Sequence, residues 1–201
     1  MISAAIHGFI LAFGLILPLG VQNVFVFNQG AVQAKWVRAL PVVLTAALCD
    51  TLLISLAVLG ISAVVFEISF LKVMLCLIGI VFLVYMGYIT WKSKPNTDKM
   101  KVQSFTAGKQ ITFAASVSLL NPHAIMDTIG VIGTSSLTYT GLDKAVFTIV
   151  CILVSWIWFL GLSIIGRVVG KLDQTGQFIS RINKISAVIM WGTAVYLAFT
   201  L

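Results

Sequence analysis

The chain contains six apolar segments of about 20 residues or more, the length that a helix needs to cross roughly 30 Å of hydrocarbon. These segments cover residues 4–27, 40–65, 70–91, 111–137, 145–166 and 184–201. Of all residues, 60% are hydrophobic and only 9% are charged, whereas about a quarter of the residues in a soluble domain are charged. One small domain has too little interior to bury this excess. The sequence therefore predicts an all-α integral membrane protein with six transmembrane helices.

The basic residues predict how the helices are oriented. Eleven of the 13 Lys and Arg residues lie in or beside the first, third and fifth loops, and only Lys72 and Lys144 lie in or beside the other two. The positive-inside rule places the Lys/Arg-rich loops in the cytoplasm. We therefore expect a multi-pass protein of the plasma (inner) membrane, with a cytoplasmic linker at 92–110 and both termini outside. The basic residues are too scattered to form a nucleic-acid-binding patch, so we expect no nucleic-acid partner.

Two segments in the two halves of the chain can be aligned without a gap. FILAFGLILPLGVQN, starting at Phe9, aligns with FAASVSLLNPHAIMD, starting at Phe113. The alignment pairs Pro18 with Pro122 and Asn23 with Asp127. A proline inside a helix removes a backbone donor and breaks the helix, so we expect breaks in helices 1 and 4.

The alignment divides one transmembrane domain, 1–201, into two three-helix repeats, 1–91 and 111–201, joined by the linker 92–110. Because three spans is an odd number, the second repeat enters the membrane from the opposite side. Inverted repeats with paired broken helices are typical of secondary transporters, whose binding sites lie near the midplane. The sequence thus predicts a transporter, with Pro18, Gly20 and Pro122 as the breaking and gating positions.

Two acidic residues lie deep inside the predicted spans. Asp50 lies about midway along the second span and Asp127 somewhat past the middle of the fourth. A carboxylate at that depth costs at least about 2.5 kcal/mol on insertion scales, so it should face the bundle interior or a water-filled cavity. No Lys or Arg lies at matching depth. We expect Asp50 and Asp127 to bind a cationic substrate or carry a proton; the alternative is a buried acid that caps a broken helix.

Amides and one histidine flank the two prolines. Gln22, Asn23 and Asn121 either bond the carbonyls freed by the breaks or hold the substrate's carboxylate and ammonium groups. His123 follows Pro122 directly and is a candidate proton relay, although a lone His in a membrane helix more often forms an interhelical hydrogen bond. The aromatic run SWIWF, starting at Ser155, is interpreted as packing.

At these residues the chain resembles the LysE-type exporters of lysine and arginine, and within them the arginine-exporter branch. The resemblance rests on LPLGVQNVFVFNQG from Leu17, SLLNPHAIMDTIGVIG from Ser118, and Asp50 in the second span. SWIWF and the last-span stretch RINKISAVIMWGTAVYLAF are similar as well. The resemblance implies export of amino acids, with basic ones favoured. It also leaves open neutral amino acids such as homoserine, threonine or leucine, and a soft metal such as cadmium, because the wider superfamily contains such exporters.

Other function classes fit the residues less well. No HExxH, GxSxG or nucleotide-binding loop occurs, so we expect no enzyme and no cofactor. Cys49 and Cys151 could contact a soft metal, but only Cys49 adjoins an acid, and we predict no resident metal site. A purely structural protein would leave the prolines and acids unexplained. A homodimer is expected because small bundles commonly associate.

Moving one positive charge out of a cell costs roughly 2.3 kcal/mol per 100 mV of inside-negative potential. An incoming proton offsets this cost if proton and substrate compete for one carboxylate. The sequence therefore predicts proton antiport or coupling to the membrane potential, with Asp127 and Asp50 as the shared carriers.

Overall fold

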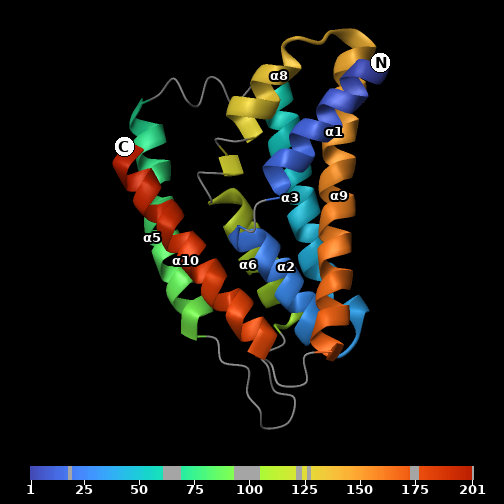
Figure 1. Cartoon of the computed structure of the whole chain (residues 1–201). Coiled ribbons are helices and arrows are strands. Elements are labelled where there is room, and N and C mark those ends of the chain that lie inside the picture. The colour runs from blue at the N-terminus through green and yellow to red at the C-terminus, as the bar shows by residue number, and fades with distance from the viewer. Residues whose placement is uncertain are drawn as a thin grey trace.

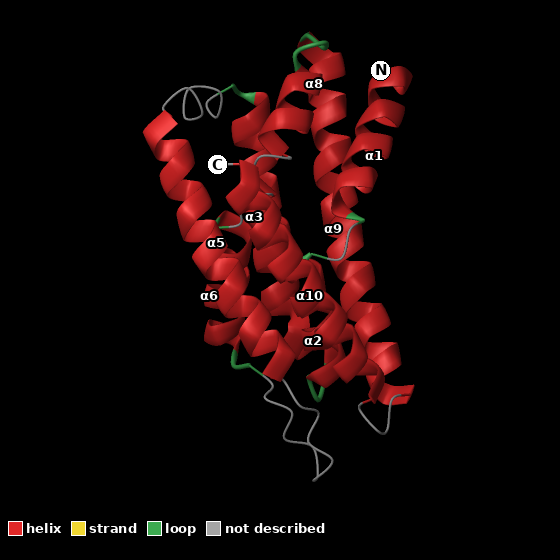
Figure 2. Ribbon diagram, turned by 60° about the vertical axis from the view of Figure 1, so that its left-hand side comes forward, coloured by secondary structure: helices red, strands yellow, loops and turns green. Residues whose placement is uncertain are grey.

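A computed structural model describes residues 1–17, 20–60, 69–92, 105–120, 124–125, 128–172 and 177–200. Every regular element within them is a helix, as the sequence predicts (Figure 2). The elements are α1 (Ile2–Ile16), α2 (Val21–Val32), the 3-10 helix η1 (Trp36–Ala39), α3 (Leu40–Val58), α5 (Ser69–Lys92), α6 (Ala107–Leu119), the π-helical turn η2 (Thr128–Gly133), α8 (Thr134–Ser136), α9 (Gly141–Leu172) and α10 (Gln177–Thr200).

The first apolar segment is bent. α1 ends at Ile16, α2 begins at Val21, and their axes differ by 78°. Gly20 precedes α2 in an extended conformation, with φ −74° and ψ 178°. The bend falls where the sequence has Pro18, which itself lies outside the described residues. An interrupted first helix was predicted from that proline.

The fourth apolar segment is also divided. α6 ends at Leu119, and a π-helical turn begins at Thr128. π-helical turns are rare and often occur at functional sites. Pro122, which was predicted to break this helix, and the neighbouring site candidates Asn121, His123 and Asp127 lie outside the described residues.

Two helical stretches in the described part of the chain are long and apolar enough to cross a membrane: Trp36–Val58 and Gly141–Leu172. The bent pair of α1 and α2 makes a third if it counts as one span. That the other three apolar segments also span the membrane, which would make six spans, stays a prediction. The second span was expected to reach residue 65, but α3 ends at Val58 because Gly60 adopts a left-handed conformation with φ 75°, a common way for a helix to end.

Helix α9 is the centre of the packing. It lies against α1, α2 and α3, while α3 also contacts α6 and η2, and α5 packs along α10 (Figure 1). The largest core joins α2, α3, α6 and α9 through small and β-branched side chains around Phe159. The first helix of each predicted repeat thus packs on the second helix of the other repeat.

Glycines bring α2 and α9 unusually close. A Cβ atom added at Gly30 would lie 2.2 Å from the Ser163 carbonyl oxygen, and one at Gly166 would lie 2.2 Å from the Phe27 carbonyl oxygen. Small residues allow such backbone contact between membrane helices. The two helices therefore pack backbone against backbone.

The Lys/Arg-rich turns meet at one end of the molecule. Arg167 of α9 donates hydrogen bonds to the carbonyl oxygens of Gln33 and Ala34, and Gln110 of α6 donates to the carbonyl oxygen of Arg38. Figure 1 shows both chain termini in its upper half and the last turns of α2 and α9 at its lower end. We call the lower end, with Lys35, Arg38, Lys109 and Arg167, the basic end.

Candidate functional site

The bend between α1 and α2 lies beside a carboxylate of α3. Gln22 is the second residue of α2, and its Nε2 donates to Asp50 Oδ1 at 3.1 Å. Ser155 of α9 faces the same carboxyl group. Asp50 is half-buried. Three helices from both predicted repeats therefore surround one acid in mid-span.

Asn23 connects the two sides of the bend. Its Nδ2 donates to the carbonyl oxygen of Ile16, the last residue of α1, at 2.7 Å. That carbonyl belongs to the last turn of a helix, where carbonyls have no partner within the helix. Asn23 Oδ1 accepts a hydrogen bond from Trp158 Nε1 at 3.2 Å, and the residue is only 6% exposed. Asn23 thus ties the end of α1 to α9, whereas Gln22 faces the acid.

Two tryptophans of α9 donate hydrogen bonds to residues beside the site. Trp156 Nε1 donates to Thr51 Oγ1 at 3.0 Å, next to Asp50 in the chain. The Trp158 ring packs edge-on against Phe13, with ring centroids 5.7 Å apart and planes at 89°. The SWIWF run, interpreted from the sequence as packing, thus also supplies two polar contacts. The signal that could have found them is the indole N–H, which needs an acceptor when it is buried.

Asp50 takes part in no ion pair within the described residues. The ion pair observed there joins the Met1 amino group to Asp143, 2.5 Å apart at the far end from the basic residues. The amide of Gln22 is neutral, so it satisfies one oxygen of Asp50 without balancing its charge. An uncompensated charge at membrane depth is costly and is typical of a substrate or ion pathway.

The other predicted site residues divide into two groups. Asp127, Asn121, His123, Pro18 and Pro122 lie outside the described residues, so the structure does not locate them. Gly20 is described, and its φ of −74° is open to any residue. A Cβ atom at Gly20 would also meet nothing within 4 Å. Its place before α2 therefore requires no glycine.

The described cysteines form no metal centre. Cys49 and Cys151 are both free and buried, and Cys151 Sγ lies 3.5 Å from the carbonyl oxygen of Gly8. In the described part of the chain, no group of three or more His, Cys, Asp and Glu side chains could hold a metal ion.

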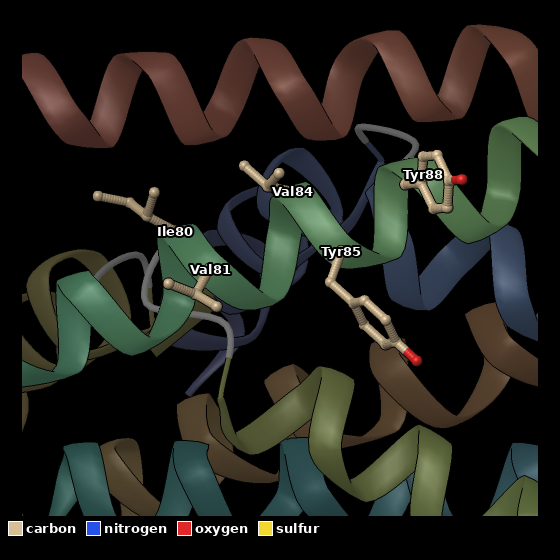
Figure 3. A pocket seen from close by; sticks show the side chains of 5 residues that line it. All are labelled: Ile80, Val81, Val84, Tyr85 and Tyr88. Carbon is tan, nitrogen blue, oxygen red and sulfur yellow. The ribbon is translucent and has the colours of Figure 1, made fainter.

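An apolar pocket of about 450 Å³ lies away from this polar site, on α5. Figure 3 shows its lining residues: Ile80, Val81, Val84, Tyr85 and Tyr88. Val84 points toward α10, and Tyr85 points to the opposite side (Figure 3). The pocket contains neither Asp50 nor any residue that bonds to it.

The apolar helices, the broken first segment and the half-buried acid in mid-span define an integral membrane protein of the transporter class. Residues 13–200 match the family model described as LysE type translocator. The chain therefore belongs to the LysE type translocator family, and it is a translocator rather than an enzyme.

Two relatives show how far the similarity extends. The chain is 55% identical over 199 residues to "Putative amino-acid transporter YisU" of Bacillus subtilis (strain 168), covering 99% of this chain and 90% of the relative. It is 32% identical over 203 residues to the arginine exporter protein ArgO of Salmonella typhimurium (strain LT2), covering 98% and 94% of the two chains. No solved structure matches the chain significantly.

Proposed function

We propose that this protein exports amino acids, with lysine and arginine as the favoured substrates, and that Asp50 binds the cationic group. The observation that carries the proposal is the contact between Gln22 and Asp50 beside the bend of the first segment. Gln22 holds the carboxylate without neutralising it, which leaves its charge for a mobile cation. The relative named arginine exporter supports the basic substrate. The relative of higher identity is named only as an amino-acid transporter, so neutral amino acids are the second candidate.

The proposed architecture is two inverted three-helix repeats, 1–91 and 111–201, with six spans. The helix pairing supports it: α1 and α2 pack on α9, and α6 and η2 pack on α3 in the corresponding way. Thr51 and Trp156, which meet where α3 crosses α9, are 105 residues apart. The alignment of Phe9 with Phe113 gives nearly the same separation (113 − 9 = 104). An axis relating the two repeats would pass close to Asp50.

The proposed location is the plasma (inner) membrane, with the basic end in the cytoplasm and both termini outside. The gathering of Lys35, Arg38, Lys109 and Arg167 at one end supports this orientation.

Proton antiport is the proposed driving force. Asp50, together with Asp127, which the sequence indicates, binds the cation when ionised and releases it when protonated. His123 remains a candidate relay and the homodimer a candidate assembly.

The test is export of radiolabelled arginine, lysine and leucine from loaded proteoliposomes with an imposed pH gradient. We expect gradient-driven export of arginine and lysine by the wild type and its loss in Asp50→Asn, because the amide cannot carry the charge. Asp143→Asn is the matched control, since Asp143 lies at the surface and pairs with the N-terminus. Unchanged uphill export by Asp50→Asn would rule out the role of Asp50. Export of leucine alone would move the assignment to neutral amino acids.

A further inference from the structure

A second polar group lies between Asp50 and the basic end. Gln29 follows Gln22 by seven residues, and Gln33, the residue that caps α2, follows it by 11. At 3.6 residues per turn the three positions fall within about 40° on one side of α2. Gln29 and Gln33 are only 4% and 3% exposed. One face of α2 therefore carries amides from the carboxylate site down to the basic end.

At the basic end these amides meet Gln110 of α6. Gln33 Nε2 donates to Gln29 Oε1 at 3.0 Å and to the Phe105 carbonyl oxygen at 3.0 Å. Gln110 Nε2 donates to the same Phe105 oxygen at 2.8 Å and to the Arg38 oxygen at 2.9 Å. We call Gln29, Gln33 and Gln110 the amide cluster. It joins the end of α2 to the beginning of α6.

The amide cluster contains one buried atom that has no hydrogen-bond partner among the described residues. The N–H donors of Gln33 and Gln110 are each shared between two acceptors, so the donors are occupied. Gln110 Oε1 is buried in a residue that is 1% exposed, and it has no partner among the described residues. Buried polar atoms are nearly always hydrogen-bonded, and each exception calls for an explanation. What the oxygen lacks is a donor.

We propose that the amide cluster is an entry subsite for the substrate, on the cytoplasmic side of Asp50, and that Gln110 Oε1 accepts a hydrogen bond from an ammonium or guanidinium group. This proposal rests on the proposed function for its direction of transport. Every amino acid carries an α-ammonium group, so the subsite suits basic and neutral substrates alike. Binding there precedes transfer along the amide face of α2 to Asp50.

The test is the KM of transport measured separately from each face of the protein, in proteoliposomes sorted by orientation, with arginine and leucine. Gln110→Met removes the acceptor while keeping the length of the side chain. We expect it to raise the KM at the cytoplasmic face about tenfold, as expected for a hydrogen bond to a charged group, and to leave the outer KM within about twofold. Gln110→Glu retains an acceptor but places a second oxygen beside the Phe105 and Arg38 carbonyl oxygens, so we expect a cytoplasmic KM between those of Gln110→Met and the wild type.

Gln33→Met is the matched control, because it breaks the amide cluster but leaves Gln110 Oε1 in place. We expect a smaller rise in the cytoplasmic KM than for Gln110→Met. An unchanged KM in Gln110→Met would mean that the oxygen binds only water, and an equal rise at both faces would mean a structural role. Either result overturns the subsite.

A wild type that transports no amino acid would refute the proposed function, and binding then decides the subsite. Methylguanidinium and methylammonium chloride are titrated into the purified protein by calorimetry. Binding that weakens in Gln110→Met but not in Asp143→Asn supports the subsite. Equal binding, or none, by the wild type and Gln110→Met overturns it.

Discussion

Asn23 shows how one side chain stabilises a broken membrane helix. The end of α1 exposes carbonyl groups that lipid cannot satisfy. Asn23 bonds the carbonyl of Ile16 and is itself held by Trp158 from another helix. Gln22, one residue earlier, is thereby aimed at Asp50. Adjacent amides thus have different tasks, one bracing the bend and one contacting the acid.

Replacing Trp158 tests this bracing. Trp158→Phe keeps an aromatic ring beside Phe13 but removes the indole donor, which leaves Asn23 Oδ1 without this hydrogen bond. We expect a loss of about 0.5–1.5 kcal/mol in the free energy of unfolding, the net contribution of one hydrogen bond. The measurement is denaturant unfolding in detergent. Trp91→Phe is the control, because Trp91 is 43% exposed on α5. Equal losses in both variants would contradict the bracing role.

Among the elements, α9 has two differently packed faces. Gly166 meets the backbone of α2, whereas a Cβ atom at Gly161 would find nothing within 4 Å. A Gly→Ala substitution at each of these two positions therefore distinguishes the effect of helix propensity on stability from the effect of packing between helices. Of these two glycines, only Gly166 is required by a neighbouring backbone.

Gly166→Ala should destabilise the protein, because its new methyl group would overlap the Phe27 carbonyl oxygen at 2.2 Å. We expect a cost of about 1–3 kcal/mol, typical of overpacking. Gly161→Ala should be neutral or stabilising, since alanine favours a helix by about 1 kcal/mol over glycine. Thermal unfolding of both variants in the same detergent makes the comparison. A Gly166→Ala variant as stable as Gly161→Ala would mean that α2 and α9 are not in close contact.

For the whole molecule, the exchange of partners between the two repeats can be tested by cross-linking. A Cβ atom at Gly133 would lie 3.5 Å from Cβ of Ala57, a separation suited to a disulfide. With Cys49, Cys76 and Cys151 replaced by Ala, we expect Ala57→Cys/Gly133→Cys to cross-link on mild oxidation. A protease site engineered into the linker should then leave the two halves joined on a denaturing gel. The pair Ala57→Cys/Gly161→Cys is the control; cross-linking in both pairs, or in neither, would contradict the packing of η2 on α3.

The sequence predicted the helical class and the bend, but not which helices pair. Pro18 indicates a helix break without any knowledge of its neighbours in the fold, because proline lacks the N–H that a helix needs. Gly60 could also have marked the end of α3, since glycine often follows a helix in a left-handed conformation. The contact of α9 with α1 and α2 could not be predicted, because helices that are apolar all round have no distinct buried face.

The site was predictable to a similar extent. Asp50 and Gln22 are recognisable as polar residues in an apolar run, and they are in contact. Trp156, Trp158 and Gln110 were missed. Tryptophan is common in membrane proteins, and Gln110 lies at the edge of an apolar segment, where an amide is expected to be solvated. Their partners come from distant parts of the chain, and only the fold identifies them.

The packing of α2 on α9 also sets an order for biosynthesis. Arg167 of α9 is made 134 residues after the Gln33 carbonyl that it bonds. At roughly 5–20 residues per second of synthesis, the first segment waits about 7–27 s before its partner emerges from the ribosome. During that interval the surface of α2 around Gly30, which packs on Ser163 of α9, is without its native cover. Folding of the first half in the membrane therefore depends on completion of the second, and a chain truncated before α9 should be a substrate for membrane quality control.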